Sequence, residues 1–244
     1  IAALRVDGLK RTLACRPALG IFADPAIAAR APARMTAAGI ADYLSKCSSS
    51  ADWQASHILR GEYYCERPRE FFDGTTEALL AAAPGAGQGG EAAVATVLEA
   101  LMLSGLSMVV AGSSAPASGG EHLLSHFMDM KHALYGTGHD LHGAQVGVGT
   151  VYCLGLWERI LSLDPKTIDP ETLIARQPSL EDVAAWTEQD WGPELGAIVL
   201  EQWKRKALSP GQLRAELATF RARQPELRER LGQDLLPAKT VAEA

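Results

Sequence analysis

The sequence has few cysteines and few aromatic residues, and its charges are not concentrated in one segment. Aromatic residues make up 6% of the 244 residues, and the four cysteines, Cys15, Cys47, Cys65 and Cys153, include no CxxC pair. This spacing predicts free thiols in a reducing compartment. The net charge of −6 and the scattered lysines and arginines argue against nucleic acid as a partner, since phosphate binding needs concentrated positive charge.

Targeting and membrane segments are also lacking. The first residue is Ile, and no charged segment precedes a short apolar run, so we expect no signal peptide and a cytoplasmic location. Residues 92–112 form an apolar run about as long as a membrane span. However, Glu99 lies near its centre, and no aromatic belt or basic flank accompanies it. We therefore expect a core helix covered on all sides, and no membrane partner.

Strand character is confined to residues 1–24. Residues 1–6 and 10–15 flank an Asp7-Gly8 turn and predict a hairpin, and the apolar run 18–23 predicts a buried third strand. Three short strands cannot cover a sheet alone, so we expect them to be the remnant of an α/β domain. Their unpaired edges favour a homo-oligomer.

The pattern from residue 25 onward is helical, which predicts a mainly α fold with a helical domain over 25–244. Asp24-Pro25 is a strong helix start, because an N-cap carboxylate precedes proline in the first turn. Helices are predicted over 91–111, 121–135 and 142–163. Breaks are expected in the glycine-rich segment 84–90 and near residues 192, 209 and 225.

Three features in the helical part carry side chains that suit chemistry. Asp42 interrupts an apolar helix, His122 and His126 share a helix face at i and i+4, and His142 opens a glycine-studded helix. Taken singly, each fits a solvent-facing or packing position better than a site. Together, one aspartate and two histidines suffice as the protein ligands of a catalytic metal, with a position left open for substrate.

Two blocks of the sequence resemble the metal-binding regions of glycerol-1-phosphate dehydrogenases. The first is FADPAIAARAPARMTAAGIADYLSK followed by ADW, and the second is SGLSMVVAGSSAPASGGEHLLSHFMDM followed by LHGAQVGVGT. The resemblance covers residues 7 to about 155 and is weak beyond about 165. It implies the C-terminal, helical half of a member of the iron-containing alcohol dehydrogenase and dehydroquinate synthase superfamily.

The resemblance implies roles for individual residues. Asp42, His122 and His142 match the metal ligands, and His126 matches a histidine at the substrate, with Asp42 touching substrate as well. The metal would be zinc, or nickel or iron in some branches, and NAD(P)H would supply hydride to dihydroxyacetone phosphate to give glycerol 1-phosphate. We expect His126 to pass the proton, since an imidazole titrates near neutrality.

Two departures from the family pattern shape the expectations. No GxGxxG stands between a strand and a helix, so we expect this chain alone to lack NAD(P) binding and activity. Ala115 stands where relatives usually have an arginine, which removes a phosphate clamp. The alternatives are therefore a polyol dehydrogenase of the same superfamily, a dehydroquinate synthase-like cyclase, and a non-catalytic helical remnant or interaction module.

Overall fold

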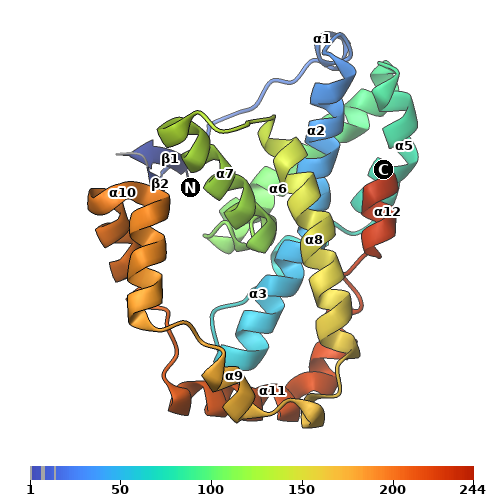
Figure 1. Ribbon diagram of the computed structural model, residues 1–244. Helices are drawn as coiled ribbons and strands as arrows, with labels where there is room; N and C mark the ends of the chain where they lie inside the picture. The colour runs from blue at the N-terminus through green and yellow to red at the C-terminus, as the bar shows by residue number, and fades with distance from the viewer. Residues whose placement is uncertain (1, 7–8, 14) are drawn as a thin grey trace. The chain divides into compact units, whose positions relative to one another are not determined.

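The computed structural model describes residues 2–6, 9–13 and 15–244, which divide into two compact units (Figure 1). The first unit comprises residues 1–162 and 226–244, and the second comprises residues 163–225. Both are mainly helical, as the sequence predicted. The domain boundary that the sequence predicts after residue 24 stays a prediction. By their contacts, the strands before it belong to the first unit.

The predicted hairpin at the start of the chain is present. Strands β1 (Ala2–Val6) and β2 (Leu9–Leu13) pair antiparallel, with Val6 opposite Leu9; the turn residues lie outside the described part. The predicted third strand over 18–23 is wrong. That segment is irregular, and the side chains of Leu19, Ile21 and Phe22 are exposed, because no neighbouring strand pairs with it among the described residues.

In its described residues the first unit continues as a series of helices. They are α1 (Pro25–Ala28), α2 (Ala33–Leu44), α3 (Lys46–Arg60), α4 (Arg67–Glu70), α5 (Thr75–Gly87), α6 (Glu91–Ala111), the short 3-10 helix η1 (Ala115–Ala117), α7 (Gly120–Tyr135), α8 (His142–Ser162) and α12 (Ala238–Glu243). The predicted N-cap is confirmed, since Asp24 accepts a hydrogen bond from the backbone of Ala26 at 2.9 Å.

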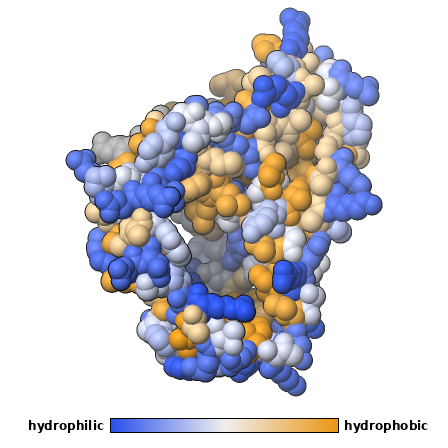
Figure 2. Space-filling model, viewed as in Figure 1, coloured by the Kyte–Doolittle hydropathy of each residue, from blue (hydrophilic) through white to orange (hydrophobic). Residues whose placement is uncertain are grey.

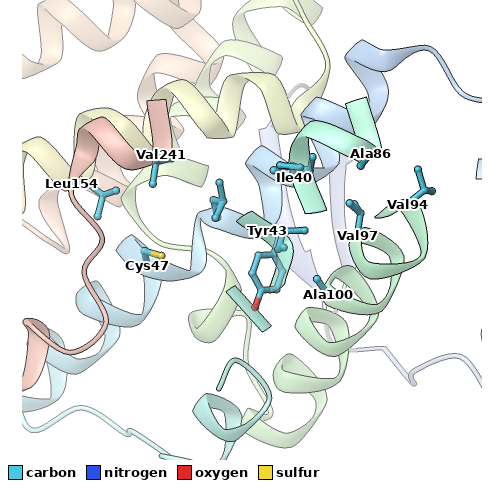
Figure 3. Packing of buried hydrophobic residues seen from close by; sticks show 12 residues of the cluster. Ile40, Tyr43, Cys47, Ala86, Val94, Val97, Ala100, Leu154 and Val241 are labelled. Atoms are coloured by element: carbon cyan, nitrogen blue, oxygen red, sulfur yellow. The ribbon is translucent and has the colours of Figure 1, made fainter. Parts of the chain in front are cut away.

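The core of the first unit lies where α2, α5, α6 and α8 meet (Figure 3). Tyr43 of α2 and Leu154 of α8 are almost fully buried, and they are joined by Val97 of α6 and Val241 of α12. The phenol of Tyr43 lies 3.4 Å from the hydroxyl of Thr76, which gives its only polar end a partner. The same packing fixes α2 and α8 against each other.

Packing also explains one wrong prediction. The segment 84–90 was predicted to be a loop, but α5 continues to Gly87 through Pro84. Ala83 and Ala86 are buried against α6, so tertiary contact outweighs the helix-breaking tendency of proline and glycine here. The chain then turns at Gly89, whose φ of +77° is one that glycine adopts readily.

Helix α6 is buried on one side only, whereas the sequence predicted a helix covered all round. Val94, Val97 and Ala100 are buried, but Leu106, Val109 and Val110 are exposed. By length and composition this helix could cross a membrane, and it is the one such helix in the described residues. In the first unit it packs against α5, α4, α1, α2 and η1.

The second unit contains 3-10 helix η2 (Pro165–Thr167), α9 (Pro170–Ala175), α10 (Leu180–Lys204) and the first part of α11 (Pro210–Leu231). Arg221 of α11 donates hydrogen bonds to the backbone carbonyls of Pro165 and Ile168, and so connects α11 to η2 and the residue after it. The predicted break near residue 192 is confirmed, since Gly192 has a φ of +75° inside α10. The break predicted near Pro225 is wrong, because α11 continues through it.

Candidate metal centre

Three predicted ligands from three helices meet in the first unit. Asp42 lies in the last turns of α2, His122 in the first turn of α7, and His142 is the first residue of α8. One ligand atom of each residue lies within 4.8 Å of the others. The Nε2 atoms of His122 and His142 lie 3.6 and 3.8 Å from Oδ1 of Asp42.

Glycines in α8 make this meeting possible. A Cβ on Gly143 would overlap the carbonyl of Ala38 in α2, and one on Gly149 would lie 2.9 Å from the carbonyl oxygen of Glu121 in α7. Helix α8 can therefore approach both backbones only without side chains at these points. At both positions the neighbouring group is backbone.

We expect Gly143→Ala to destabilise the chain by roughly 1–3 kcal/mol, because the methyl group must displace the backbone of α2. Since Asp42 follows on α2, zinc affinity should fall as well. Gly155→Ala is the matched control, because a Cβ there meets nothing within 4 Å in the same helix. It should be neutral or stabilising by up to about 1 kcal/mol in urea unfolding. Equal stability of the two variants would contradict this role for Gly143.

A second layer of polar groups orients both imidazoles. His122 Nδ1 lies 2.9 Å from Oε1 of Glu121, and His142 Nδ1 lies 2.9 Å from the hydroxyl of Ser125. Ser125 Oγ is also 2.9 Å from the side-chain amide of Gln145. Each imidazole thus uses Nδ1 within the protein and presents Nε2 to Asp42, an arrangement typical of metal-ligating histidines.

Sequence reasoning missed this second layer. Glu121 is fully buried and also accepts from the backbone of Gly119 at 2.6 Å and the hydroxyl of Ser48 at 2.7 Å. Asp52 accepts from the backbone of Gly120 at 2.7 Å and from the indole of Trp157 at 2.8 Å. In the sequence, only their neighbours could have pointed to these two residues, because Glu121 immediately precedes His122 and Asp52 belongs to the ADW motif.

The arrangement suits a divalent cation on its own chemistry. Oδ1 of Asp42 is buried and has no hydrogen-bond partner in the described part of the chain, which is costly unless something else satisfies it. Ligands of a tetrahedral zinc ion lie about 3.4 Å apart, given bond lengths of roughly 2.0–2.1 Å. The spacings at Asp42 are close to that value, so the three residues fit the ion that the resemblance implies.

The pKa values of the cluster reflect burial opposed by charge. Burial raises the pKa of Asp42, but His122 and Lys46 outweigh it, so the pKa lies below its usual range. Burial lowers the pKa of His122, but Asp42 and Glu121 raise it above the usual value. For His142 burial prevails over the carboxylates, and its pKa is lowered.

His126 lies beside the three ligands. Its ring centroid is 5.4 Å from that of His142 and 6.1 Å from that of His122. Burial, together with the charges of Lys10 and its histidine neighbours, lowers the pKa of His126 to about 4. The sequence-based expectation that this imidazole titrates near neutrality is therefore wrong, and at neutral pH His126 is an uncharged hydrogen-bonding group.

A cavity of about 210 Å³ opens onto the cluster. This volume is below the roughly 300–1,000 Å³ of pockets for drug-sized ligands, so the cavity suits a small molecule. Its wall includes the cluster itself, His126, a lysine from β2 and one from the start of α3, a serine of α6, and the two serines that flank η1: Lys10, Lys46, Ser104, Ser114 and Ser118. Ala115 of η1 contributes no side-chain donor.

The described residues form a mainly helical protein in which one aspartate and two histidines are placed so that they could hold a divalent metal ion. Its curated relatives include the glycerol-1-phosphate dehydrogenase [NAD(P)+] of Geobacillus stearothermophilus, which is 32% identical over 178 residues, 70% of this chain and 44% of that protein. The enzyme of the same name from Thermococcus kodakarensis is 35% identical over 190 residues, 71% of this chain and 52% of that protein.

A third relative of the same name, from Haloarcula marismortui, is 41% identical over 142 residues, 58% of this chain and 39% of that protein. No protein-family model matches the chain. The chain spans about half the length of the curated relatives it matches. It is similar to glycerol-1-phosphate dehydrogenases over that span, which confirms the resemblance seen in its two sequence blocks.

Proposed function

We propose that this chain provides the metal- and substrate-binding part of an NAD(P)-linked dehydrogenase that interconverts dihydroxyacetone phosphate and glycerol 1-phosphate. The observation that carries the proposal is the cluster of Asp42, His122 and His142 around an unsatisfied carboxylate oxygen. The names of the relatives support the reaction and the nicotinamide cofactor.

In this proposal Asp42, His122 and His142 hold the metal ion, which is zinc, or nickel or iron. When bound, the ion supplies Lewis-acid polarisation of the substrate oxygen. Glu121 and Ser125 bind Nδ1 of the two imidazoles and so keep Nε2 of each turned towards Asp42, where it would be free to hold the ion. Asp42 and His126 contact the substrate. His126, uncharged at neutral pH, relays the proton to the reacting oxygen, with one ring nitrogen releasing a proton as the other takes one up from solvent.

Lys46 supports a phosphorylated substrate even though Ala115 offers no clamp. Its side chain is buried four residues after Asp42, and it lines the same cavity as His122 and His126. Burial lowers the pKa of Lys46, while Asp42 and Glu121 oppose that effect. An amino group here can pair with a phosphate that approaches the metal cluster.

Lys46→Met should weaken binding of glycerol 1-phosphate to the zinc-loaded chain by roughly 10- to 100-fold, because one charge-assisted hydrogen bond is lost. Lys131→Met is the matched control, since that amino group lies over the rings of Tyr135 and Phe127 and does not line the cavity. Titration calorimetry measures the affinity of the wild type and of the two variants for glycerol 1-phosphate, and for glycerol as the unphosphorylated comparison. If glycerol binds the wild type as tightly as its phosphate, the polyol dehydrogenase alternative is favoured.

Two further parts of the proposal concern the oligomeric state of the protein and its location in the cell. We propose a homo-oligomer, supported by the exposed apolar side chains of α7 and α8, among them Leu123, Phe127, Val148 and Tyr152. Figure 2 shows apolar surface in the region of these two helices. Light scattering after size exclusion tests it, and a monomer at micromolar concentration would contradict it. A cytoplasmic location is supported by the four free thiols.

We also propose that this chain alone turns over no substrate, since its sequence carries no dinucleotide-binding motif. Nicotinamide cofactor titrated into the zinc-loaded chain should give no saturable change in intrinsic tryptophan fluorescence. Metal binding with no cofactor binding is the expected pair of results. Saturable micromolar binding of NADH or NADPH would overturn this part and leave the metal site untouched.

A further inference from the structure

Lys10 reaches the cavity of the candidate metal centre from the hairpin, outside the helices that supply the metal ligands. It lines the cavity of about 210 Å³ at the cluster, and it also lines a neighbouring cavity of about 280 Å³. His126 belongs to the wall of both cavities as well. The charge of Lys10 helps to lower the pKa of His126, so the ammonium lies on the His126 side of the cavity.

Contacts with α7 and within β2 fix the position of Lys10. Its backbone N–H donates a hydrogen bond to Sδ of Met130 at 3.2 Å, and Leu9 before it is buried. Its side chain turns to Thr12, since Nζ donates to Oγ1 of Thr12 at 2.8 Å. Thr12 also lines the 210 Å³ cavity, so the two residues, on one face of β2, present an amino group and a hydroxyl to the same space.

The ammonium of Lys10 has no counter-ion in the described part of the chain. Its hydroxyl partner is neutral, and no described carboxylate forms an ion pair with it. Asp129, which lines the neighbouring cavity, pairs with His139 instead, at 3.2 Å. Partial burial lowers the pKa of Lys10, because the ammonium has lost part of its hydration. A bound anion would supply the charge partner that this ammonium lacks.

The second lysine of the cavity is held differently. The buried Nζ of Lys46 lies 3.3 Å from Oγ of Ser45 and 3.4 Å from the carbonyl oxygen of Ala117, and the charge of Asp42 acts on it. Among the described residues that line the cavity, Asp42 is the one carboxylate, and the two lysines outnumber it even before a metal ion binds. The cavity therefore favours an anionic ligand, and Lys10 is the lysine whose charge is left for it.

We propose that Lys10 determines specificity for a phosphorylated substrate, by pairing its Nζ with the phosphate group while the metal cluster holds the oxygen that reacts. Thr12 accepts from Lys10 and so keeps its own O–H to donate to the same phosphate. Ala115 offers no side-chain donor, so the positive charge that recognises phosphate comes from Lys10 together with Lys46. This inference deepens the proposed function and rests on it.

The test is titration of the zinc-loaded chain by calorimetry with glycerol 1-phosphate, inorganic phosphate and glycerol. Lys10→Met should weaken binding of both phosphates by roughly 10- to 100-fold, because one charge-assisted hydrogen bond is lost, and should leave glycerol binding unchanged. Lys10→Arg should keep most of the affinity, since a guanidinium also pairs with phosphate. Arg11→Met is the matched control, because it removes an exposed positive charge from the opposite face of β2.

Far-UV circular dichroism and zinc content check that each variant is folded and loaded with metal. If the wild type prefers glycerol 1-phosphate to glycerol, but Lys10→Met binds it equally well or Arg11→Met loses as much, the role of Lys10 is overturned and the proposed function stands. If the wild type binds inorganic phosphate through Lys10 but prefers glycerol to glycerol 1-phosphate, the proposed substrate is wrong and Lys10 is only an anion-binding residue. A wild type that binds neither phosphate overturns both.

Discussion

His142→Ala is expected to lower the affinity of the chain for Zn²⁺ by well over roughly 100-fold, because it removes one of three protein ligands. Ser125→Ala leaves the ligands in place and removes only the hydroxyl at His142 Nδ1. Loss of such an orienting group typically costs about 10- to 100-fold in metal affinity. The expected order of affinities is therefore wild type, Ser125→Ala, then His142→Ala.

Competition with a chromophoric chelator measures these affinities on the purified chain. His57→Ala serves as the control for loss of an imidazole elsewhere on the surface. If Ser125→Ala binds zinc as weakly as His142→Ala, the hydroxyl acts on more than ligand orientation. Unchanged affinity in His142→Ala would remove this residue from the ligand set.

Glu121→Ala is expected to destabilise the chain by about 3–5 kcal/mol, the usual result of removing one partner from a buried, charged network. The carboxylate is fully buried and accepts from Gly119, Ser48 and His122. Removing it leaves three polar groups without an acceptor. Glu121→Gln keeps one acceptor oxygen and should cost only about 1–3 kcal/mol.

Urea unfolding of the metal-free chain separates this stability effect from metal binding. Zinc affinity, measured under native conditions, should fall in both variants because His122 loses its orienting carboxylate. If the free energy of unfolding of Glu121→Ala lies within about 1 kcal/mol of the wild-type value, water replaces the carboxylate and the hydrogen-bond network is not a structural requirement.

The three candidate ligands could be predicted from the sequence because two of its blocks resemble the metal-binding regions of glycerol-1-phosphate dehydrogenases. Spacing alone places His122 and His126 on one face of a helix. The spacing of residues along the sequence does not show which distant residue each side chain contacts. Glu121 and Ser125 act through hydrogen bonds to residues up to 73 positions away, so no local pattern marks them.

The errors in the fold have the same origin. The run 18–23 has the composition of a strand, but a strand forms only beside another strand, and none pairs with it in the described chain. The segment 84–90 has the composition of a loop, but burial of Ala83 and Ala86 extends the helix. The pKa of His126 was misjudged because burial and neighbouring charges were invisible in the sequence.

The most direct test of the metal centre is metal content by mass spectrometry, on wild type and Asp42→Asn after extensive dialysis. Asp42 supplies the carboxylate of the candidate centre, and its buried oxygen lacks a hydrogen-bond partner among the described residues. The account predicts about one tightly held zinc, nickel or iron per wild-type chain and essentially none in Asp42→Asn. A wild-type chain that holds no metal, and takes up none on addition, would contradict it and leave a helical domain without a catalytic centre.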